Sequence, residues 1–374
     1  MNLPADPELI GQPGSRGMIP TPAAVLDLDA FDRNVAKMAA RAKAAGLALR
    51  PHAKSHKCSA LAARQIEAGA VGICCAKLAE AEAMALAGID AILVTSPIAG
   101  GFAAERAARL ADLLADFRIV VDHVDGVAEL AAAATSPIQV IIDVDVGLGR
   151  TGVGSPEQAA QVAQAILLEP NLKLIGVQGY GGAWQHMEGA NVRADAVAAG
   201  MARLSAAISA IREAGGTVEV VTGGGTGTFA ADAAQGVLTE VQPGSFAFMD
   251  REYREALKSD PDGAFEQSLF VATTVISANH PKWVTVDGGL KAFSTDGPAP
   301  LPFTPKFAGC RYRFFGDEHG MLMRPEGATV ARGERVELAP GHIDPTLDRY
   351  DVLHLVRGDV LVDIVPIEAR GAGQ

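Results

Sequence analysis

The sequence predicts an α/β protein, a (β/α)8 barrel of the TIM type followed by a smaller, mostly β domain. From about Thr21, short apolar runs alternate with longer, amphipathic and Ala-rich runs in about eight successive units. This pattern is typical of a parallel sheet covered by helices. After about Gln267 the long helical runs stop, and short strand-like runs alternate with Gly and Pro turns. Over 374 residues, a closed barrel is favoured over an open, doubly wound sheet. No Gly-x-Gly-x-x-Gly turn follows the first strand, which argues against a dinucleotide-binding fold.

The first predicted strand covers residues 23–28, and a helix follows it. Asp29 is placed to cap this helix and Gly46 to end it, while Phe31, Val35 and Met38 recur between them at helical spacing. Further strands are predicted over residues 47–51, 71–75, 91–95, 118–122, 138–143, 172–177, 218–221 and 236–240, and then over 270–276, 283–287, 335–338 and 360–365. We therefore expect a barrel domain over residues 18–266 and a β domain over residues 267–374. The N-terminal arm, residues 1–17, is expected to pack on the β domain.

The composition indicates a soluble protein of the cytoplasm. Lys and Arg number 32 against 44 Asp and Glu, for a net charge of −12, and no basic run is present, so we expect no nucleic-acid partner. The four cysteines form no Cys-x-x-Cys pair, which fits a reducing compartment. No signal peptide is recognisable at the N-terminus, and no apolar run reaches membrane-spanning length, so we expect no membrane partner.

A candidate nucleophile lies in the segment Arg50-Pro-His-Ala-Lys-Ser-His-Lys57. On a strand, Arg50, His52 and Lys54 point to one face, and Lys54 falls at the carboxyl end of the predicted strand, where barrel enzymes place their chemistry. In a partly dry cavity, a lysine loses the solvation of its ammonium form, its pKa falls, and its amine becomes nucleophilic. The segment alone fits a surface cluster of Lys and His equally well.

A candidate phosphate site lies in Val221-Thr-Gly-Gly-Gly-Thr-Gly-Thr228, between a strand and a possible helix. Glycines let backbone N–H groups turn toward an anion. Gly244 and Ser245, after the next strand, are placed to complete the cup, because the last two loops of a barrel are a common phosphate site. A plain glycine turn is the alternative. A lysine and a phosphate cup on one barrel face together suggest pyridoxal phosphate.

His342 and Asp344 form a candidate metal pair. They are two residues apart, so both project to the same side of an extended segment. A His nitrogen with a carboxylate oxygen suits Mn²⁺, Mg²⁺ or Zn²⁺, and two protein ligands leave positions open for water and substrate. On the motif alone, a surface turn is the commoner explanation.

The chain resembles the family of D-threonine aldolase, 3-hydroxy-D-aspartate aldolase and eukaryotic-type D-serine dehydratase. The resemblance implies the alanine racemase fold, which is a barrel followed by a C-terminal β domain. It extends over nearly the whole chain through ordered motifs, which are Thr21-Pro-Ala-Ala-Val-Leu-Asp-Leu-Asp29, Arg50–Lys57, Gly149-Arg-Thr-Gly152, Gly179-Tyr-Gly-Gly-Ala-Trp-Gln-His186, Gly223-Gly-Gly-Thr-Gly227, Gln242-Pro-Gly-Ser245, Asp317-Glu-His-Gly320 and Pro340-Gly-His-Ile-Asp-Pro-Thr346.

The resemblance also implies site residues. Lys54, rather than Lys57, would carry pyridoxal 5'-phosphate as a Schiff base, and Arg150 would hydrogen-bond its pyridine nitrogen. His186 would be the catalytic base, directly or through water. The implied cofactor-binding residues are Lys54, Arg150, Tyr180, Gly225, Thr226, Gly227, Gly244, Ser245 and Tyr253; the substrate-binding residues are Tyr180, Gln185, His186 and His319; the metal ligands are His342 and Asp344.

Two positions refine what the resemblance implies. Some aldolases of the family have a glutamine that contacts the cofactor where this chain has Ala76, so another group must support the ring on that side. The dehydratases have Cys where this chain has Asp344. A carboxylate favours harder metals than a thiolate does, so Mn²⁺ or Mg²⁺ is expected ahead of Zn²⁺.

The function that the resemblance implies is retro-aldol cleavage of a D-3-hydroxy-amino acid to glycine and an aldehyde, by a homodimer that uses a divalent metal. A D-serine or 3-hydroxyaspartate dehydratase is the alternative, and a non-catalytic carrier of the cofactor is a further one. Alanine racemase fits less well, because the metal pair has no role in that reaction. The sequence does not choose between a methyl and a carboxylate on the substrate's Cβ.

Overall fold

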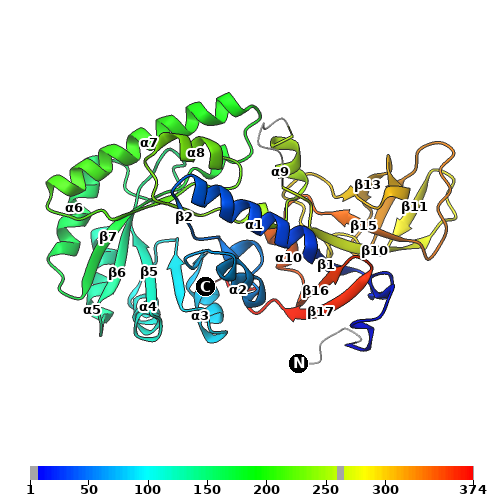
Figure 1. The fold of residues 1–374 in the computed structure, drawn as a ribbon, viewed down its shortest axis with the longest axis horizontal. Helices are drawn as coiled ribbons and strands as arrows, with labels where there is room; N and C mark the ends of the chain where they lie inside the picture. The colour runs from blue at the N-terminus through cyan, green and yellow to red at the C-terminus, as the bar shows by residue number, and fades with distance from the viewer. Residues whose placement is uncertain (1–6, 259–264, 374) are drawn as a thin grey trace. The chain divides into compact units, whose positions relative to one another are not determined.

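The computed structural model describes residues 7–258 and 265–373 and contains one parallel and one mixed β-sheet (Figure 1). The chain forms two compact units. The barrel unit comprises residues 37–54, 59–244 and 371–374, and the β unit comprises residues 1–36, 55–58 and 245–370. The β unit thus includes residues 18–36 and 245–258, which the sequence led us to place in the barrel domain.

The barrel unit contains an eight-stranded parallel sheet in the order β2-β9-β8-β7-β6-β5-β4-β3. Its two end strands are joined by a bridge between His52 and Cys74 and by a backbone bond of 2.8 Å from Cys74 to Pro51, so the sheet closes on itself and the predicted barrel is confirmed. The strands are β2 (Ala48–Leu49), β3 (Ile73–Cys75), β4 (Ala91–Val94), β5 (Asp116–Val121), β6 (Ile138–Asp143), β7 (Leu172–Gly179), β8 (Val220–Gly223) and β9 (Glu240–Val241).

Helices alternate with these strands and cover the outer side of the sheet (Figure 1). Apolar side chains from five neighbouring strands form a common buried cluster of Cys74, Leu93, Val120, Ile141 and Ile175. Capping residues mark where helices begin. In α6, for example, Ser155 accepts a bond from the backbone of Gln158, which is a typical N-cap. The helices are α2 (Ser59–Glu67), α3 (Leu78–Leu86), α4 (Gly101–Leu113), α5 (Val124–Ala133), α6 (Pro156–Leu167), α7 (Ala190–Glu213) and α8 (Phe229–Gln235).

A ring of four charged side chains, the ion cluster, lies inside the barrel unit. The side chain of Arg50 is 1 % exposed; its Nε donates to Glu240 at 3.0 Å and its Nη2 to Asp116 at 3.2 Å. Arg118 closes the ring with contacts of 2.8 Å to Asp116 and 3.6 Å to Glu240. Gly72 leaves room for Arg50, because a Cβ there would lie 2.4 Å from Nη1. The opposite charges replace the hydration that the buried guanidinium has lost.

A chain of hydrogen bonds, the polar ladder, runs on from this ion cluster. Thr222 donates to Glu240 at 2.9 Å and accepts from Gln242 at 3.0 Å. Gln242 donates to Gln178 at 3.1 Å, and Gln178 donates to Asp143 at 2.9 Å. All five side chains are buried. Barrel interiors are usually filled by branched apolar residues, so this polar interior is stable only because each group is paired.

The second sheet, in the β unit, has nine strands, with β13-β14-β11-β10-β1-β16-β17 as its main path. The strands predicted over residues 270–276, 283–287, 335–338 and 360–365 are confirmed as β10, β11, β15 and β17. The bounds are β1 (Ala23–Asp27), β10 (Leu269–Ser277), β11 (Trp283–Val286), β12 (Leu301–Pro302), β13 (Arg311–Phe314), β14 (Gly320–Met323), β15 (Arg335–Ala339), β16 (Val352–Arg357) and β17 (Val360–Pro366), with the helices α1 (Leu28–Ala44), α9 (Arg251–Ala256) and α10 (Asp344–Leu347) elsewhere in the chain.

Strand β1 corrects one expectation. We predicted residues 23–28 as the first strand of the barrel, but β1 lies between β10 and β16 in the second sheet. The run Ala23–Leu26 is buried throughout. A continuous apolar run fits the middle of either sheet, and periodicity does not distinguish between them.

The N-terminal arm packs on the β unit, as expected, within its described residues 7–17. Leu9 joins the apolar cluster that contains Val25, Val356 and Leu361. The backbone of Gly11 bonds to that of Leu361 at 2.9 Å. The arm therefore extends the packing of the second sheet.

Helix α7 bears on the expectation that no apolar run reaches membrane-spanning length, although charged residues interrupt it. Within the described chain it alone is long and apolar enough, by length and composition, to cross a membrane. A core helix of a soluble protein passes the same test, and Val197, Met201, Leu204 and Ile211 of α7 are buried against the rest of the chain. This is weak evidence for a membrane span.

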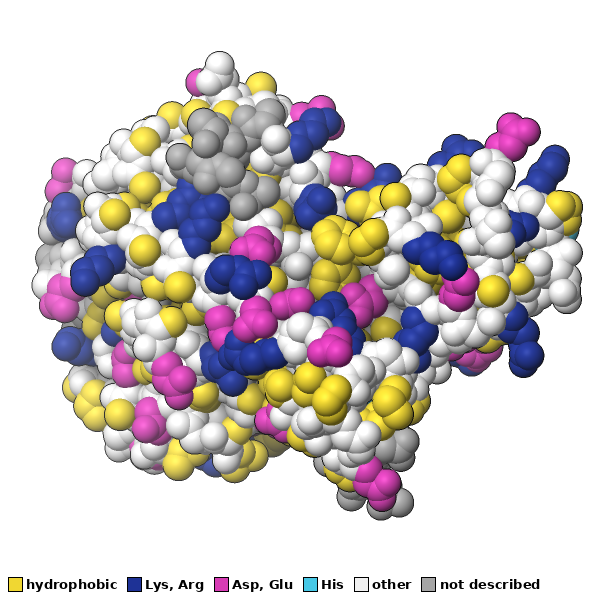
Figure 2. Space-filling model, turned by 45° about the vertical axis from the view of Figure 1, so that its right-hand side comes forward, with side chains coloured by type: hydrophobic (Ala, Val, Ile, Leu, Met, Phe, Trp, Pro, Cys, Tyr) yellow, Lys and Arg dark blue, Asp and Glu magenta, His cyan; other side chains and the backbone are white. Residues whose placement is uncertain are grey.

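The surface carries charges of both signs. Figure 2 shows Lys and Arg side chains interspersed with Asp and Glu over one face of the molecule. The face in this view has no broad basic patch of the kind that binds a phosphate backbone.

The ion cluster predicts a large loss of stability when Arg50 is removed. Arg50→Ala should lower the free energy of unfolding by about 3–5 kcal/mol, because Glu240 would remain buried with only the 3.6 Å contact to Arg118 as its counter-charge. Urea titration measures the loss. The matched control is Arg33→Ala, which breaks the exposed pair with Glu266 and should cost under about 1 kcal/mol. Similar small losses in both variants would contradict the stabilising role of the ion cluster.

Candidate active site

Lys54 lies just beyond the carboxyl end of β2, in a single 3-10 turn (Ala53–Ser55). It lines a cavity of about 120 Å³ in the barrel unit, close to the volume of about 150 Å³ that accepts a benzene ring. The residues around it follow the carboxyl ends of several strands, as in other barrel enzymes. They are His52, Lys54, Ala76, Thr95, Ser96, Arg150, Gln178, Tyr180 and Gln242.

The hydrogen bonds of His52 define its tautomer. The hydroxyl of Thr95 donates to the carbonyl of Cys75 at 3.2 Å, so it accepts from Nε2 of His52 at 3.1 Å. Nδ1 then accepts from the backbone N–H of Lys54 at 3.4 Å. A neutral imidazole with its proton on Nε2 satisfies both contacts, and it holds the wall of the cavity beside Lys54.

The two candidate lysines have different surroundings. The Nζ of Lys57 pairs with Asp348 at 2.7 Å in the β unit, whereas Lys54 lines the cavity. Lys57 is not among the residues that line this cavity. The geometry therefore favours Lys54 as the reactive lysine.

Arg150 and Tyr180 are brought together at the cavity. The guanidinium carbon of Arg150 lies 5.8 Å from the centroid of the Tyr180 ring. The loop that carries Arg150 is shaped by Asp145, which accepts from the backbone of Gly147 at 2.9 Å and of Gly149 at 3.0 Å. The cation is thus presented on a loop whose bends are held by a carboxylate.

Asp143 also supports the loop that carries Arg150. It accepts from Thr151 at 2.8 Å and from Gln178 at 2.9 Å. Burial raises the pKa of Asp143. Through these two bonds, the polar ladder reaches the residues next to Arg150.

The glycine-rich segment forms the loop between β8 and α8, and Gly225, Thr226 and Gly227 in it are buried. A Cβ on Gly225 would lie 2.4 Å from the side chain of Gln185, and one on Gly227 would lie 2.0 Å from its backbone oxygen. These glycines are therefore required by close packing within the protein.

Gln185 and His186 differ in how far they are exposed to solvent. Gln185, which we predicted to contact the substrate, is 1 % exposed. Its side chain bonds to Thr228 and Gly227 inside the barrel unit. His186 is half-buried. Between these two predicted substrate contacts, only His186 retains access from outside.

The candidate metal pair lies in the β unit. His342 contacts Asp296 through Nδ1 at 2.8 Å, and Asp344 begins α10. The residue between them is held by Asp250, whose carboxylate accepts from the backbone of Ile343 at 3.1 Å. Burial raises the pKa of Asp250 to about 7, with the charge of Asp344 acting in the same direction and His342 opposing it.

Asp296 and Asp250 are residues that the sequence did not single out. Neither lies in a recognisable motif, and Asp296 is 46 residues from His342 in the chain. In the described ranges, no group of three or more His, Cys, Asp or Glu side chains is arranged to hold a metal ion. The predicted pair of His342 and Asp344 is therefore not part of a larger cluster of such side chains within those ranges.

The other predicted site residues lie on separate elements of the chain. Ser245 begins a short 3-10 turn, and Tyr253 is buried in α9. His319 is exposed in the loop between β13 and β14. Gly244, which precedes Ser245, is half-buried in the barrel unit.

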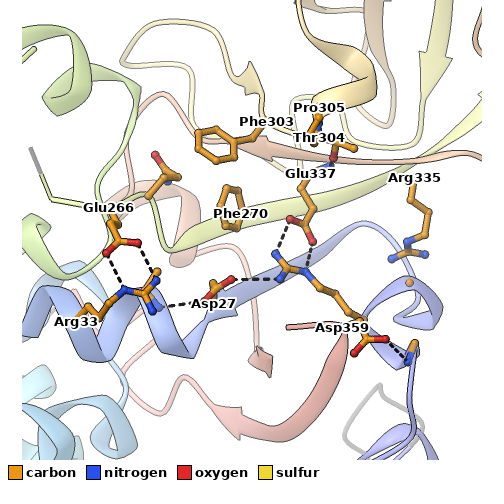
Figure 3. Close-up of a pocket in the computed structure, with 15 residues that line it drawn as sticks. Asp27, Arg33, Glu266, Phe270, Phe303, Thr304, Pro305, Arg335, Glu337 and Asp359 are labelled. Atoms are coloured by element: carbon orange, nitrogen blue, oxygen red, sulfur yellow. Dashed lines mark hydrogen bonds and ion pairs between the residues drawn. The ribbon is translucent and has the colours of Figure 1, made fainter. Parts of the chain in front are cut away.

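Another cavity, of about 670 Å³, lies in the β unit (Figure 3). Two of the three arginines that line it are already paired with carboxylates. Arg16 makes two bonds of 2.8 Å to Glu337, and Arg33 makes two of 2.8 Å to Glu266. Bidentate pairs leave these cations little capacity for a ligand, so the smaller cavity at Lys54 is the better candidate.

Known protein families match both parts of the chain. The family model for the alanine racemase N-terminal domain matches residues 26–252, and that for a putative serine dehydratase domain matches residues 268–356. The chain is similar to D-threonine aldolase of Arthrobacter sp (39 % identity, 98 % of this chain and 96 % of that protein). It is also similar to 3-hydroxy-D-aspartate aldolase of Paracoccus denitrificans (37 %, 95 % and 93 %). D-threo-3-hydroxyaspartate dehydratase of Delftia sp. is 31 % identical (91 % and 94 %).

The solved structures lead to the same group. The crystal structure of D-threonine aldolase from Filomicrobium marinum superimposes with a TM-score of 0.92 at 37 % identity, over 96 % of this chain and 98 % of that one.

Proposed function

The chain belongs to the family of D-threonine aldolase and 3-hydroxy-D-aspartate aldolase, and we propose that it cleaves a D-3-hydroxy-amino acid into glycine and an aldehyde. The observation that carries this proposal is the position of Lys54. It lines a ring-sized cavity with Arg150 and Tyr180 at the carboxyl end of the barrel strands, in a chain 36–39 % identical to aldolases over nearly its whole length.

The cofactor we propose is pyridoxal 5'-phosphate. The residues present fit it, because the cavity has the volume of an aromatic ring and is lined by an amine and a guanidinium. When bound, the cofactor supplies the sink for the electron pair of the cleaved bond. Lys54 would hold it covalently, and Arg150 would donate to its ring nitrogen. A guanidinium does not give up its proton, so Arg150 would leave that nitrogen unprotonated.

The loops at the carboxyl ends of β8 and β9 would hold the phosphate group. Gly225, Thr226 and Gly227 form the first of these loops. Gly244 and Ser245 form the second, and Tyr253 follows them in α9.

We propose that His342 and Asp344 hold a divalent metal, with Mn²⁺ or Mg²⁺ expected ahead of Zn²⁺. The donor set fits, because Asp296 engages Nδ1 of His342 and leaves Nε2 as the ligand atom. When bound, the metal supplies Lewis acidity for the substrate's 3-hydroxyl.

His186 is the proposed general base. It would accept the proton of the 3-hydroxyl as the Cα–Cβ bond breaks, which leaves the aldehyde carbonyl. The electron pair of that bond remains on Cα, and a proton delivered there completes glycine. Tyr180 and His319 are proposed to position the substrate.

A dehydratase is the second candidate, supported by the relative at 31 % identity. It would release ammonia and a 2-oxo acid. The carboxylate of Asp344 favours the aldolase, because the dehydratases have a cysteine at this position and a thiolate favours zinc. From family membership we further expect a homodimer of the cytoplasm whose other partner is the small-molecule substrate.

The products identify the reaction. With D-threonine, D-3-hydroxyaspartate and D-serine as separate substrates and Mn²⁺ present, we expect glycine and an aldehyde from one or both of the first two. Amino-acid analysis and an aldehyde assay measure these products. Chelation of the metal should stop aldehyde release and leave the cofactor bound. Ammonia and a 2-oxo acid as main products would establish the dehydratase instead.

A pair of lysine variants tests the cofactor site. Lys54→Ala should abolish the absorbance band of the covalently held cofactor and lower activity by several orders of magnitude, because no other lysine lines the described cavity. Lys57→Ala should retain the band, since its amine is paired with Asp348. A retained band in Lys54→Ala, or its loss only in Lys57→Ala, would refute the assignment.

Asp296 should tune metal affinity. Asp296→Asn removes the carboxylate that orients His342, and partners of this kind typically contribute about 10–100-fold in affinity. Titration of the cofactor-loaded protein with Mn²⁺, followed by calorimetry, measures the change. Asp351→Asn, which breaks the exposed pair with Arg370, is the control. Equal affinity in the wild type and both variants would exclude a role for Asp296 in metal binding.

A further inference from the structure

Gln185 is a buried amide whose hydrogen-bonding groups are directed at the glycine-rich loop. It follows a 3-10 turn (Gly182–Trp184) after β7 and is 1 % exposed. Its Nε2 donates to the hydroxyl of Thr228 at 2.9 Å and to the carbonyl of Gly181 at 3.3 Å. Its Oε1 accepts from the backbone N–H of Gly227 at 2.9 Å. Both ends of the amide are thus committed within the protein.

The chain of bonds continues to Asp232 in α8. The hydroxyl of Thr228 donates to Asp232 at 2.6 Å. Because a hydroxyl has only one proton, its oxygen is left to accept from Gln185, which defines the orientation of the amide. Asp232 is 1 % exposed. Burial raises its pKa to about 7, and hydrogen bonds from Thr228 and from the backbone of Gly225 act in the opposite direction.

The same two side chains are in close contact with the loop. A Cβ on Gly225 would lie 2.4 Å from Oε1 of Gln185, and one on Gly224 would lie 2.5 Å from Asp232. Gly224 also has a φ of +68°, which side chains rarely adopt. Gln185 and Asp232 therefore support the inner side of the loop at successive residues.

We propose that Gln185 is a positioning residue that holds the Gly223–Thr228 loop in the shape that accepts the cofactor's phosphate, with Thr228 and Asp232 as its anchor, and does not contact the substrate. The proposal rests on the function proposed above. It also assigns different roles to the residues of the loop. The N–H groups of Gly225 and Gly227 are bonded to Asp232 and Gln185, so these two residues shape the loop, and Thr226 between them is placed to contact the anion.

Gln185→Leu removes all three side-chain bonds at similar volume. The buried N–H of Gly227 would then lack its acceptor, which typically costs about 1–3 kcal/mol, and Thr228 would keep only its bond to Asp232. Gln185→Glu is the conservative variant, because it retains an acceptor for Gly227 and loses the donor for Thr228. Gln158→Leu is the matched control. Gln158 also accepts from a glycine N–H, that of Gly154 at 2.8 Å, at an exposed position on α6.

The experiment titrates each apoprotein with pyridoxal phosphate and, separately, with pyridoxal, which lacks the phosphate. We expect Gln185→Leu to weaken pyridoxal phosphate binding about tenfold or more, to leave pyridoxal binding unchanged, and to speed hydrogen exchange of the amides of residues 223–228. Gln185→Glu should give an intermediate loss. The control should match the wild type, and at saturating cofactor the substrate KM should be unchanged in all variants.

The outcomes separate the two proposals. A raised substrate KM in Gln185→Leu, with unchanged cofactor affinity and loop exchange, would overturn the positioning role. Equal losses for pyridoxal phosphate and pyridoxal would also overturn it, because the phosphate would not be involved. If the wild type binds no pyridoxal phosphate, the proposed function fails, while loop exchange in Gln185→Leu still reports whether the support exists.

Discussion

A guanidinium without access to water stays inside a protein only where carboxylates and hydrogen bonds replace its hydration. Arg50 meets this condition through Glu240 and Asp116. From Glu240 the bonds pass along the polar ladder to Asp143, which supports the loop that carries Arg150. The need to pair one buried cation therefore extends through the barrel interior to the residues around Lys54, and the position of the candidate site depends on it.

The buried polar groups of the glycine-rich loop are also paired. Its backbone N–H groups at Gly225 and Gly227 are paired with Asp232 and Gln185. Glycine is required in the loop because a Cβ would clash with these two residues. Asp232 has a folded pKa of about 7, above the ordinary value of 3.8. Its ionised form therefore lowers the stability of the fold as the pH rises through about 7. The hydrogen bonds from Thr228 and from the backbone of Gly225 offset part of the cost of burying this carboxylate.

Local patterns in the sequence were sufficient for most of the strands and for placing Lys54 at the carboxyl end of a strand, whereas Arg150 and Tyr180, which line the same cavity, were indicated only by family motifs. Local patterns failed for residues 23–28, since an apolar run carries no information about which sheet it joins. They did not find Asp296, which reaches His342 from 46 residues away. For Gln185, family motifs indicated the right neighbourhood and not the direction in which the side chain points.

Lys54 lies close to the seam at which the barrel closes. Strand β2 has only two residues. Its seam with β3 includes the backbone bonds of 2.8 Å from Val71 to Leu49 and from Cys74 to Pro51, beside the bridge at His52, two residues before the lysine. A ligand that binds at Lys54 more tightly when this seam is closed would oppose its local opening, because binding to one form stabilises that form. The chain without such a ligand would then be the form more open to proteolysis.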